Sequence, residues 1–408
     1  MTQVAGSQCP KLRAVDARPV VHNGRPSILL RDPLRLTDKT IIVPQQLSPV
    51  LALCDGTRDA TALSAALAVR FGVRAAPSTL EQLLRALDGA LLLDNERFAQ
   101  GRDHALAEYR QAPFRPVSNG GESYPTDADE LRGQLQGYLG AAGDVTPGSA
   151  VGRGLISPHI DFGRGGSVYA QVWKRAAEMA KEAELAILLG TDHYGEGNLL
   201  TLTQQHYATP FGVLPTAREI VDEVARAVGP ETAFAGELHH RGEHSIELAA
   251  VWLHFIREEQ PCELVPILCG SFDRFVQSQA DPAQDRAINA LLDTLRSVMA
   301  RRRVLVVSAA DLSHVGPAFG GQPLGFVERA RLQTADEELM ERICAGDTQG
   351  FFAAIQRDGD RRNVCGLPAI YLAMRLLHPV QGERVAYARC PADERGTSWV
   401  SICGIVFG

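Results

Sequence analysis

The pattern of apolar and polar positions divides the chain into two parts, and the second part has the simpler pattern. Four apolar runs there predict buried strands, over residues 154–156, 185–189, 263–268 and 303–308. Stretches with helical spacing lie between or beside them, over residues 167–181, 218–227, 245–258 and 285–299. Apolar strands that alternate with helices are typical of a largely parallel sheet covered on both faces. The pattern therefore predicts an α/β domain over residues 114–408.

The first hundred residues have shorter elements. Two short strands are predicted over 27–30 and 40–43, and three helices over 47–56, 59–71 and 78–87. Ser78 is the expected N-cap of the third helix, with Glu81 at the reciprocal capping position. Residues 89–93 read as a further strand and turn. This order predicts a small winged-helix-like α+β domain over residues 1–100, followed by a linker over residues 101–113.

Composition excludes several classes of protein. The chain has 408 residues and a formal net charge of −7, which argues against a general nucleic-acid surface. No apolar run approaches about 18 residues, so a membrane span is not expected. The first twenty residues carry no apolar core of the secretory type, and we expect a cytoplasmic protein. The eight cysteines form no CxxC pair, which disfavours a disulfide framework or a zinc ribbon.

Five short segments place metal-ligating or acid–base side chains at a strand end or a helix start. They are Ser157-Pro158-His159, Gly190-Thr191-Asp192-His193, Glu243-His244-Ser245, Asp311-Leu312-Ser313-His314 and Cys365-Gly366. Ligands of an open α/β sheet bind beyond the carboxyl ends of its strands. Together the segments predict one polar site at that edge of the sheet.

His159 precedes a glycine run, residues 163–166, which we interpret as a turn that allows close approach of a ligand. The alternative is a histidine that only bonds the backbone at a helix entry. His193 follows a buried strand and would point into the crevice, where neutral imidazole is the commonest ligand of a transition metal. Asp192 either orients the His193 ring or caps a helix.

His244 stands at the start of an apolar helix, where the macrodipole disfavours its protonated form and suits it to acid–base work. Glu243 and Ser245 are candidate caps there. Asp311 could support a ligand histidine, with His314 close by. Cys365 lies at a helix start, which favours a thiolate and hence metal ligation or nucleophilic attack. An ordinary buried cysteine is the alternative.

Two resemblances rest on these residues. From about Phe114 to the C-terminus the chain resembles the Memo family, of the AmmeMemoRadiSam system protein B type. Its motifs here are GESYPTDADELRGQLQGYL (121–139), ISPHIDFGRGG (156–166), LLGTDHYG (188–195), YATPFGVL (207–214), EHSIELAAVWL (243–253), VPILCGSF (265–272), SAADLSHVG (308–316) and CGLPAI (365–370). Residues 25–98, which contain the sequence LALCDG, resemble the PqqD-like peptide-recognition domains.

The Memo resemblance implies a fold similar to that of class III extradiol dioxygenases and a mononuclear metal site. Carried over position by position, it implies that His159, His193 and Cys365 are the metal ligands. His244 would be the acid–base residue, with Asp192, Asp311 and His314 beside the site. Two histidines and a thiolate suit Fe(II), which is expected first, and also copper or zinc.

The expected function is that of a metal-dependent oxidoreductase. Its substrate would be a small molecule or a peptide, and its partner an enzyme of a peptide-modifying or radical SAM system. Nucleic acid and membrane are not expected as partners. Arg241, just before His244, would bring positive charge to the rim and favour an anionic substrate. Two alternatives remain: a non-catalytic peptide- or metal-binding protein, and a zinc-dependent hydrolase.

Overall fold

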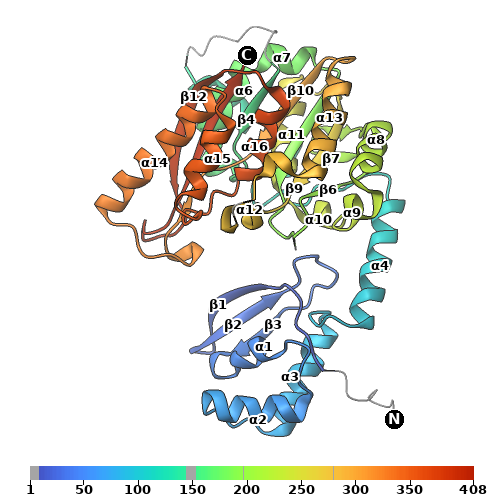
Figure 1. Ribbon diagram of the computed structural model, residues 1–408, viewed down its shortest axis with the longest axis vertical. Coiled ribbons are helices and arrows are strands. Elements are labelled where there is room, and N and C mark those ends of the chain that lie inside the picture. Colours follow the sequence, from blue (N-terminus) through green and yellow to red (C-terminus); the bar gives the residue numbers. More distant parts are fainter. Residues whose placement is uncertain (1–8, 144–152, 196, 279) are drawn as a thin grey trace. The chain divides into compact units, whose positions relative to one another are not determined.

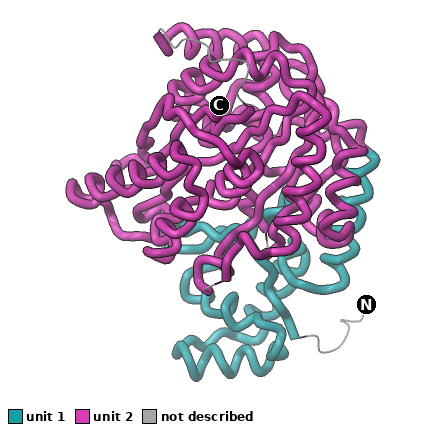
Figure 2. The backbone as a smooth tube through the Cα atoms, turned by 45° about the horizontal axis from the view of Figure 1, so that its top comes forward, with its two compact units in different colours: residues 1–111 teal, residues 112–408 magenta. Residues whose placement is uncertain are grey.

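The computed structural model describes residues 9–143, 153–195, 197–278 and 280–408. The chain divides into two compact units, residues 1–111 and residues 112–408 (Figure 2). Where the sequence predicts a linker from residue 101, the structure has helix α4 (Glu96–Gln111), whose last residue is also the last of the first unit. Among the described residues, no helix is both long and apolar enough to cross a membrane.

The first unit packs an antiparallel sheet on short helices. Its elements are β1 (Asp16–His22), β2 (Arg25–Arg31), β3 (Ile41–Pro44), the 3-10 turn η1 (Gln45–Leu47), α1 (Pro49–Leu53), α2 (Ala60–Phe71) and α3 (Pro77–Gly89). The predicted strands over 27–30 and 40–43 form β2 and β3, which pair with each other. Helix α2 begins as expected, because the Asp59 side chain accepts a hydrogen bond from Ala62 N–H.

Two predictions for this unit are wrong. Ser78 is not a cap: α3 already begins at Pro77, whose ring favours the first helical position. Residues 89–93 do not form a strand, since α3 runs through Gly89 and Leu93 makes only an isolated bridge with Leu12. The last strand of the predicted winged-helix-like domain is therefore not formed there.

The second unit contains a large mixed sheet. Its strands are β4 (Gly154–Ser157), β5 (Leu185–Thr191), β6 (Leu200–Leu202), β9 (Glu263–Cys269), β10 (Val304–Ala309), β11 (His314–Val315), β12 (Gly382–Pro391) and β13 (Trp399–Phe407), and a separate pair is formed by β7 (Tyr207–Thr209) and β8 (Gly212–Leu214). The order is β11-β13-β4-β10-β5-β9-β6, with β12 beside β13. The four central strands are parallel and correspond to the four predicted apolar runs.

Helices cover both faces of this sheet (Figure 1). The helices of this unit, among the described residues, are α5 (Ala128–Ala141), α6 (Phe162–Arg175), α7 (Ala177–Glu182), α8 (Arg218–Val228), α9 (Pro230–Phe234), α10 (His239–Gly242), α11 (Ser245–Ile256), α12 (Asp273–Gln277), α13 (Arg286–Met299), α14 (Phe326–Cys344), α15 (Thr348–Gln356) and α16 (Leu367–Leu377), with 3-10 turns η2 (Pro282–Gln284) and η3 (Pro317–Phe319). This is the α/β class that the sequence predicts.

Strand β5 shows why the apolar runs are continuous. Leu185, Ile187 and Leu189 belong to one hydrophobic core, with residues of α8, α13 and α16. Ala186 and Leu188 belong to a second core, with residues of α6 and α11. Because successive side chains point to opposite faces, a strand buried on both sides needs apolar residues throughout.

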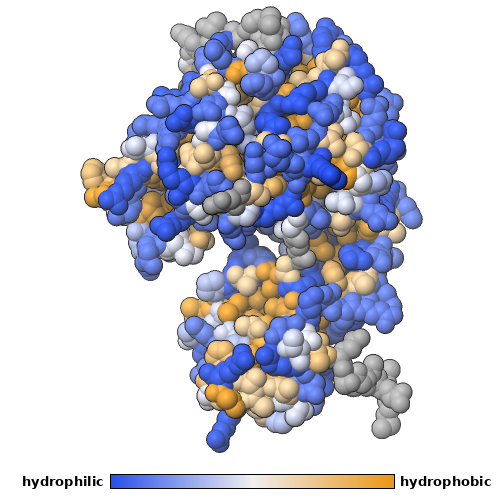
Figure 3. Space-filling model, in the orientation of Figure 1, coloured by the Kyte–Doolittle hydropathy of each residue, from blue (hydrophilic) through white to orange (hydrophobic). Residues whose placement is uncertain are grey.

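The surface that Figure 3 shows is mostly hydrophilic, with scattered apolar spots. One such spot lies at the projecting end of α14, where Phe326 is 84% exposed. Single exposed apolar residues are normal on folded proteins.

The glycine run at 163–166 is not a ligand-binding turn, which corrects the prediction. It lies in the first turns of α6, which starts at Phe162 and is capped by the Asp161 side chain, five residues before the predicted start. A β-carbon at Gly166 would lie 2.5 Å from the ring of Tyr138 on α5. Gly166 therefore allows the close packing of α6 against α5.

We expect Gly166→Ala to lower the free energy of unfolding by about 1–3 kcal/mol, because the added methyl group overpacks the Tyr138 ring. Gly137→Ala is the matched control, since it lies in α5 with nothing within 4 Å of its β-carbon position. That change should stabilise the protein by up to about 1 kcal/mol through helix propensity. Denaturant titration measures both. A Gly166→Ala protein as stable as the Gly137→Ala protein would contradict the packing described.

Candidate metal centre

Adjacent strands deliver the candidate ligands to one edge of the sheet. His159 follows the end of β4, His193 follows β5, and Asp311 follows β10, which lies between those two strands. Cys365 lies two residues before α16. The carboxyl ends of parallel strands meet at the same edge of a sheet, so residues far apart in the sequence meet there.

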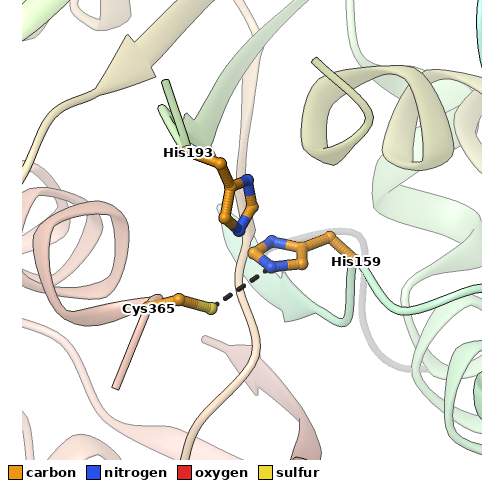
Figure 4. Close-up of side chains that lie close together, drawn as sticks. All are labelled: His159, His193 and Cys365. Atoms are coloured by element: carbon orange, nitrogen blue, oxygen red, sulfur yellow. Dashed lines mark hydrogen bonds between the residues drawn. The ribbon is translucent and has the colours of Figure 1, made fainter. Parts of the chain in front are cut away.

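Three side chains point toward one another at this edge (Figure 4). Nε2 of His159 lies 3.2 Å from Sγ of Cys365. The ring centroids of His159 and His193 are 5.0 Å apart. One ligand atom from each of the three residues lies within 4.8 Å of the other two. The sequence-predicted ligand set is thus brought together.

His159 is held from two sides. Its backbone N–H donates to Asp311 Oδ1 at 2.8 Å. Its ring Nδ1 lies 2.9 Å from the carbonyl oxygen of Ala309, which accepts only, so Nδ1 carries the proton. Nε2 is then the nitrogen that remains for a metal, and it faces Cys365. Asp311 supports the backbone of His159 from the neighbouring strand end.

His193 is held by Glu243. Its Nδ1 lies 3.0 Å from both carboxylate oxygens of Glu243, and its backbone N–H donates to the same carboxylate at 3.1 Å. The His193 side chain is 30% exposed, whereas that of Glu243 is fully buried. A carboxylate on Nδ1 orients the ring and leaves Nε2 for a metal.

His244 and His314 lie beside these ligands. The His244 ring stacks on that of His193, with centroids 4.8 Å apart and planes at 18°. Its Nδ1 contacts Glu243 Oε1 at 3.1 Å, so the Glu243 carboxylate engages this nitrogen and not Nε2. His314, on β11, places Nδ1 3.2 Å from the carbonyl of Leu312.

The electrostatics of the site favour a thiolate. Burial opposes the charge of Cys365, but His159 and His314 outweigh it and hold the pKa of the thiol well below its usual range. Burial likewise opposes a charged His159, yet Asp311 and Cys365 raise its pKa to about 9. Burial also opposes the charge of Glu243, but His193 and His244 lower the pKa of its carboxyl group well below its usual range. The metal-free site is a cluster of paired charges.

The donor set fits a transition metal. A thiolate and two imidazoles with Nδ1 already engaged are the ligand forms that such ions need. Two ligands of one tetrahedral ion, with bonds of about 2.1 Å to nitrogen and 2.3 Å to sulfur, stand about 3.6 Å apart. The 3.2 Å between His159 and Cys365 is a little shorter, so a small outward movement admits an ion.

A cavity of about 440 Å³ opens onto His193 and Cys365. Its wall includes His314 and Phe319, whose rings are 5.0 Å apart, and the carboxylates of Asp192, Asp273 and Asp360. No lysine or arginine lines it among the described residues. Arg241 is not among the residues that line the cavity. The lining therefore does not support the predicted preference for an anionic substrate.

Comparison with known proteins identifies the family. The family model for Memo-like proteins matches residues 115–405. The chain belongs to the Memo family. A MEMO1 family protein of Aquifex aeolicus is 24% identical over 405 residues, covering 98% of this chain and 99% of that protein. A MEMO1 family protein of Thermus thermophilus is 27% identical, and the match covers 78% of this chain and 90% of that protein. A MEMO1 family protein of Methanopyrus kandleri is 25% identical, and the match covers 66% of this chain and 89% of that protein.

Two contacts of this Memo-family site differ from the sequence interpretation. Asp192 does not orient His193: its Oδ2 lies 2.9 Å from Nδ1 of His239 and its Oδ1 accepts from Tyr194 N–H. Glu243 takes that role and also accepts the backbone N–H groups of His244 and Ser245 at the start of α11, where His244 is the N-cap residue. An acidic residue just before a helix signals a cap, but nothing in the sequence connects it to a residue fifty positions earlier.

Metal affinity should depend on pH. In the metal-free protein His159, with its pKa near 9, binds a proton that a metal must displace, and the pKa of His193 is raised as well. Cys365 is already a thiolate and releases none. We therefore expect the apparent affinity for Zn(II) to rise steadily from pH 6 to pH 9, measured by competition with a chelator. An affinity independent of pH over this range would contradict the charge state described.

Proposed function

We propose that this Memo-family chain is a metal-dependent oxidoreductase, with Fe(II) as the metal and O₂ or a related oxidant as the electron acceptor. One observation carries the proposal: the imidazoles of His159 and His193 and the thiolate of Cys365 converge, and two of these residues, His193 and Cys365, line a cavity of about 440 Å³. Three protein ligands leave coordination positions open to the cavity, as catalytic sites require and closed structural sites do not.

When bound, the ion supplies Lewis-acid and redox chemistry at its open position. The chain supplies the remaining functions. His159 and His193 are held by Asp311, Ala309 and Glu243, so both imidazole rings are oriented before a metal binds. A preorganised site avoids the cost of ordering its ligands during binding.

His244 is the proposed acid–base residue. Its ring stacks on that of His193, and Glu243 engages its Nδ1, so Nε2 is the atom that can accept or donate a proton. General acid–base catalysis requires such a group within hydrogen-bond reach of the reacting atom. Asp192, Asp311 and His314 are proposed to act beside it, as parts of the cavity wall or as supports of the ligands.

The substrate is proposed to be a small molecule or a peptide. For the first unit we propose a peptide-recognition role of the PqqD-like type. A peptide-modifying or radical SAM enzyme is the proposed partner. The antiparallel sheet β1-β2-β3 is consistent with such a module, because sheet edges pair with extended peptides.

Metal analysis after anaerobic purification tests the proposal. We expect close to one iron per chain in the wild-type protein and less than a tenth of that in the double variant His159→Ala, Cys365→Ala, measured by mass spectrometry. His244→Ala is the matched control, because it should keep the metal and lose only turnover. Loss of the metal in His244→Ala would overturn the role given to that residue.

The other outcomes favour other functions. Stoichiometric zinc with no effect of oxygen would favour a hydrolase, since thiolate and imidazole also suit Zn(II). Absence of any metal, even after anaerobic loading with Fe(II), would exclude the oxidoreductase and leave a peptide-binding protein.

A further inference from the structure

A fully buried ion pair lies behind the metal centre, between Arg115 and Glu247. Both side chains have no exposed surface, and Arg115 Nη1 lies 2.5 Å from Glu247 Oε2. Replacing such a pair by apolar residues is often neutral or stabilising, so its presence calls for an explanation beyond stability. The contacts of the guanidinium group provide one.

Arg115 binds both ends of the α10 turn. Its Nε donates to the carbonyl oxygen of His240, and its Nη2 donates to that of Glu243 at 2.9 Å. The His240 ring is fixed as well, with Nδ1 2.6 Å from Tyr207 OH and Nε2 3.0 Å from the carbonyl of Thr201. The turn from residue 240 to residue 243 is therefore held at both ends.

Glu247 holds the guanidinium group in turn. Its carboxylate accepts hydrogen bonds from the backbone N–H groups of Ser118 and Asn119, the amide of Asn119 and the hydroxyl of Tyr124. Burial opposes its charge, but Arg115 and these donors lower its pKa. The carboxylate thus stays charged and fixes the arginine.

We infer that Arg115 is a positioning residue of the metal centre: held by Glu247, it fixes the carbonyls of His240 and Glu243 so that the Glu243 carboxylate meets Nδ1 of His193. The inference rests on the proposed metal site. It assigns this ion pair to ligand orientation, through a chain of contacts from Glu247 to Arg115, Glu243 and His193. A lysine cannot replace the arginine, because one ammonium group cannot span two carbonyls and a carboxylate in fixed directions.

The test compares Arg115→Lys with Leu253→Ala in the full-length protein. Leu253 is fully buried near the end of α11, about two turns from the site, and its truncation lowers stability without touching the turn. We expect Arg115→Lys to weaken Zn(II) binding by about 10–100-fold, the usual effect of losing a support behind a ligand. Leu253→Ala should bind Zn(II) as the wild-type protein does.

A second variant separates positioning from stability. Arg115→Met combined with Glu247→Met removes both charges and keeps the buried volume, so this double variant should fold. It loses the hydrogen bonds from Arg115 to the carbonyl oxygens of His240 and Glu243. We expect the same weakening of Zn(II) binding in this variant. Wild-type affinity in either Arg115 variant would overturn the inference.

Hydrogen exchange of the metal-free protein gives a measurement that does not depend on metal binding. The amides of His193, His244 and Ser245 all donate to Glu243, so they should exchange faster in Arg115→Lys than in Leu253→Ala. If the wild-type protein binds no metal, the proposed function fails, yet faster exchange would still show that Arg115 positions Glu243. Unchanged exchange would contradict the inference itself.

Discussion

The arrangement of the site depends on one buried carboxylate. Glu243 has no exposed side-chain surface and accepts hydrogen bonds from the backbone N–H groups of His193, His244 and Ser245 and from the ring of His193. A buried charge is tolerated only when it is paired and fully hydrogen-bonded. Because these donors come from the end of β5 and the start of α11, satisfying this one charge also fixes the position of a candidate ligand and of the candidate acid–base histidine.

The sheet makes that arrangement possible. Its parallel strands β4, β10 and β5 end side by side, with an apolar core on each face. Polar side chains next to rigid strand ends are held more precisely than those on a loop alone. The hydrophobic cores on the two faces of the sheet exclude water from the region behind the site. The charges therefore concentrate at one edge, where the thiolate of Cys365 is balanced by His159 and His314.

The sequence predicts the part of this structure that depends on local pattern. Apolar runs identify β4, β5, β9 and β10, and the Memo motifs identify His159, His193 and Cys365, which the structure brings within ligand distance of one another. Strand β1 is missed, although Asn23-Gly24, with φ of 51° and 72°, is a typical hairpin turn. The strand itself is largely exposed, so it lacks the apolar alternation by which strands are recognised.

Contacts between distant residues could not be predicted in this way. The partner of Asp192 is His239 rather than the adjacent His193, and Glu243 bonds a residue fifty positions away. Arg115 lies two residues after the predicted linker, in a segment without a predicted element, yet it is fully buried and contacts α10. Hydrogen-bond partners of this kind follow from the packing of strands and helices, which a single sequence does not specify.

X-ray absorption spectroscopy of the protein loaded anaerobically with Fe(II) tests the central claim most directly. The account predicts one sulfur neighbour at about 2.3 Å and two imidazole nitrogens at about 2.1 Å, in line with the usual metal–ligand distances. The sulfur neighbour should disappear in Cys365→Ser. A spectrum without sulfur in the wild-type protein, or with sulfur retained in Cys365→Ser, would show that the metal does not bind at His159, His193 and Cys365.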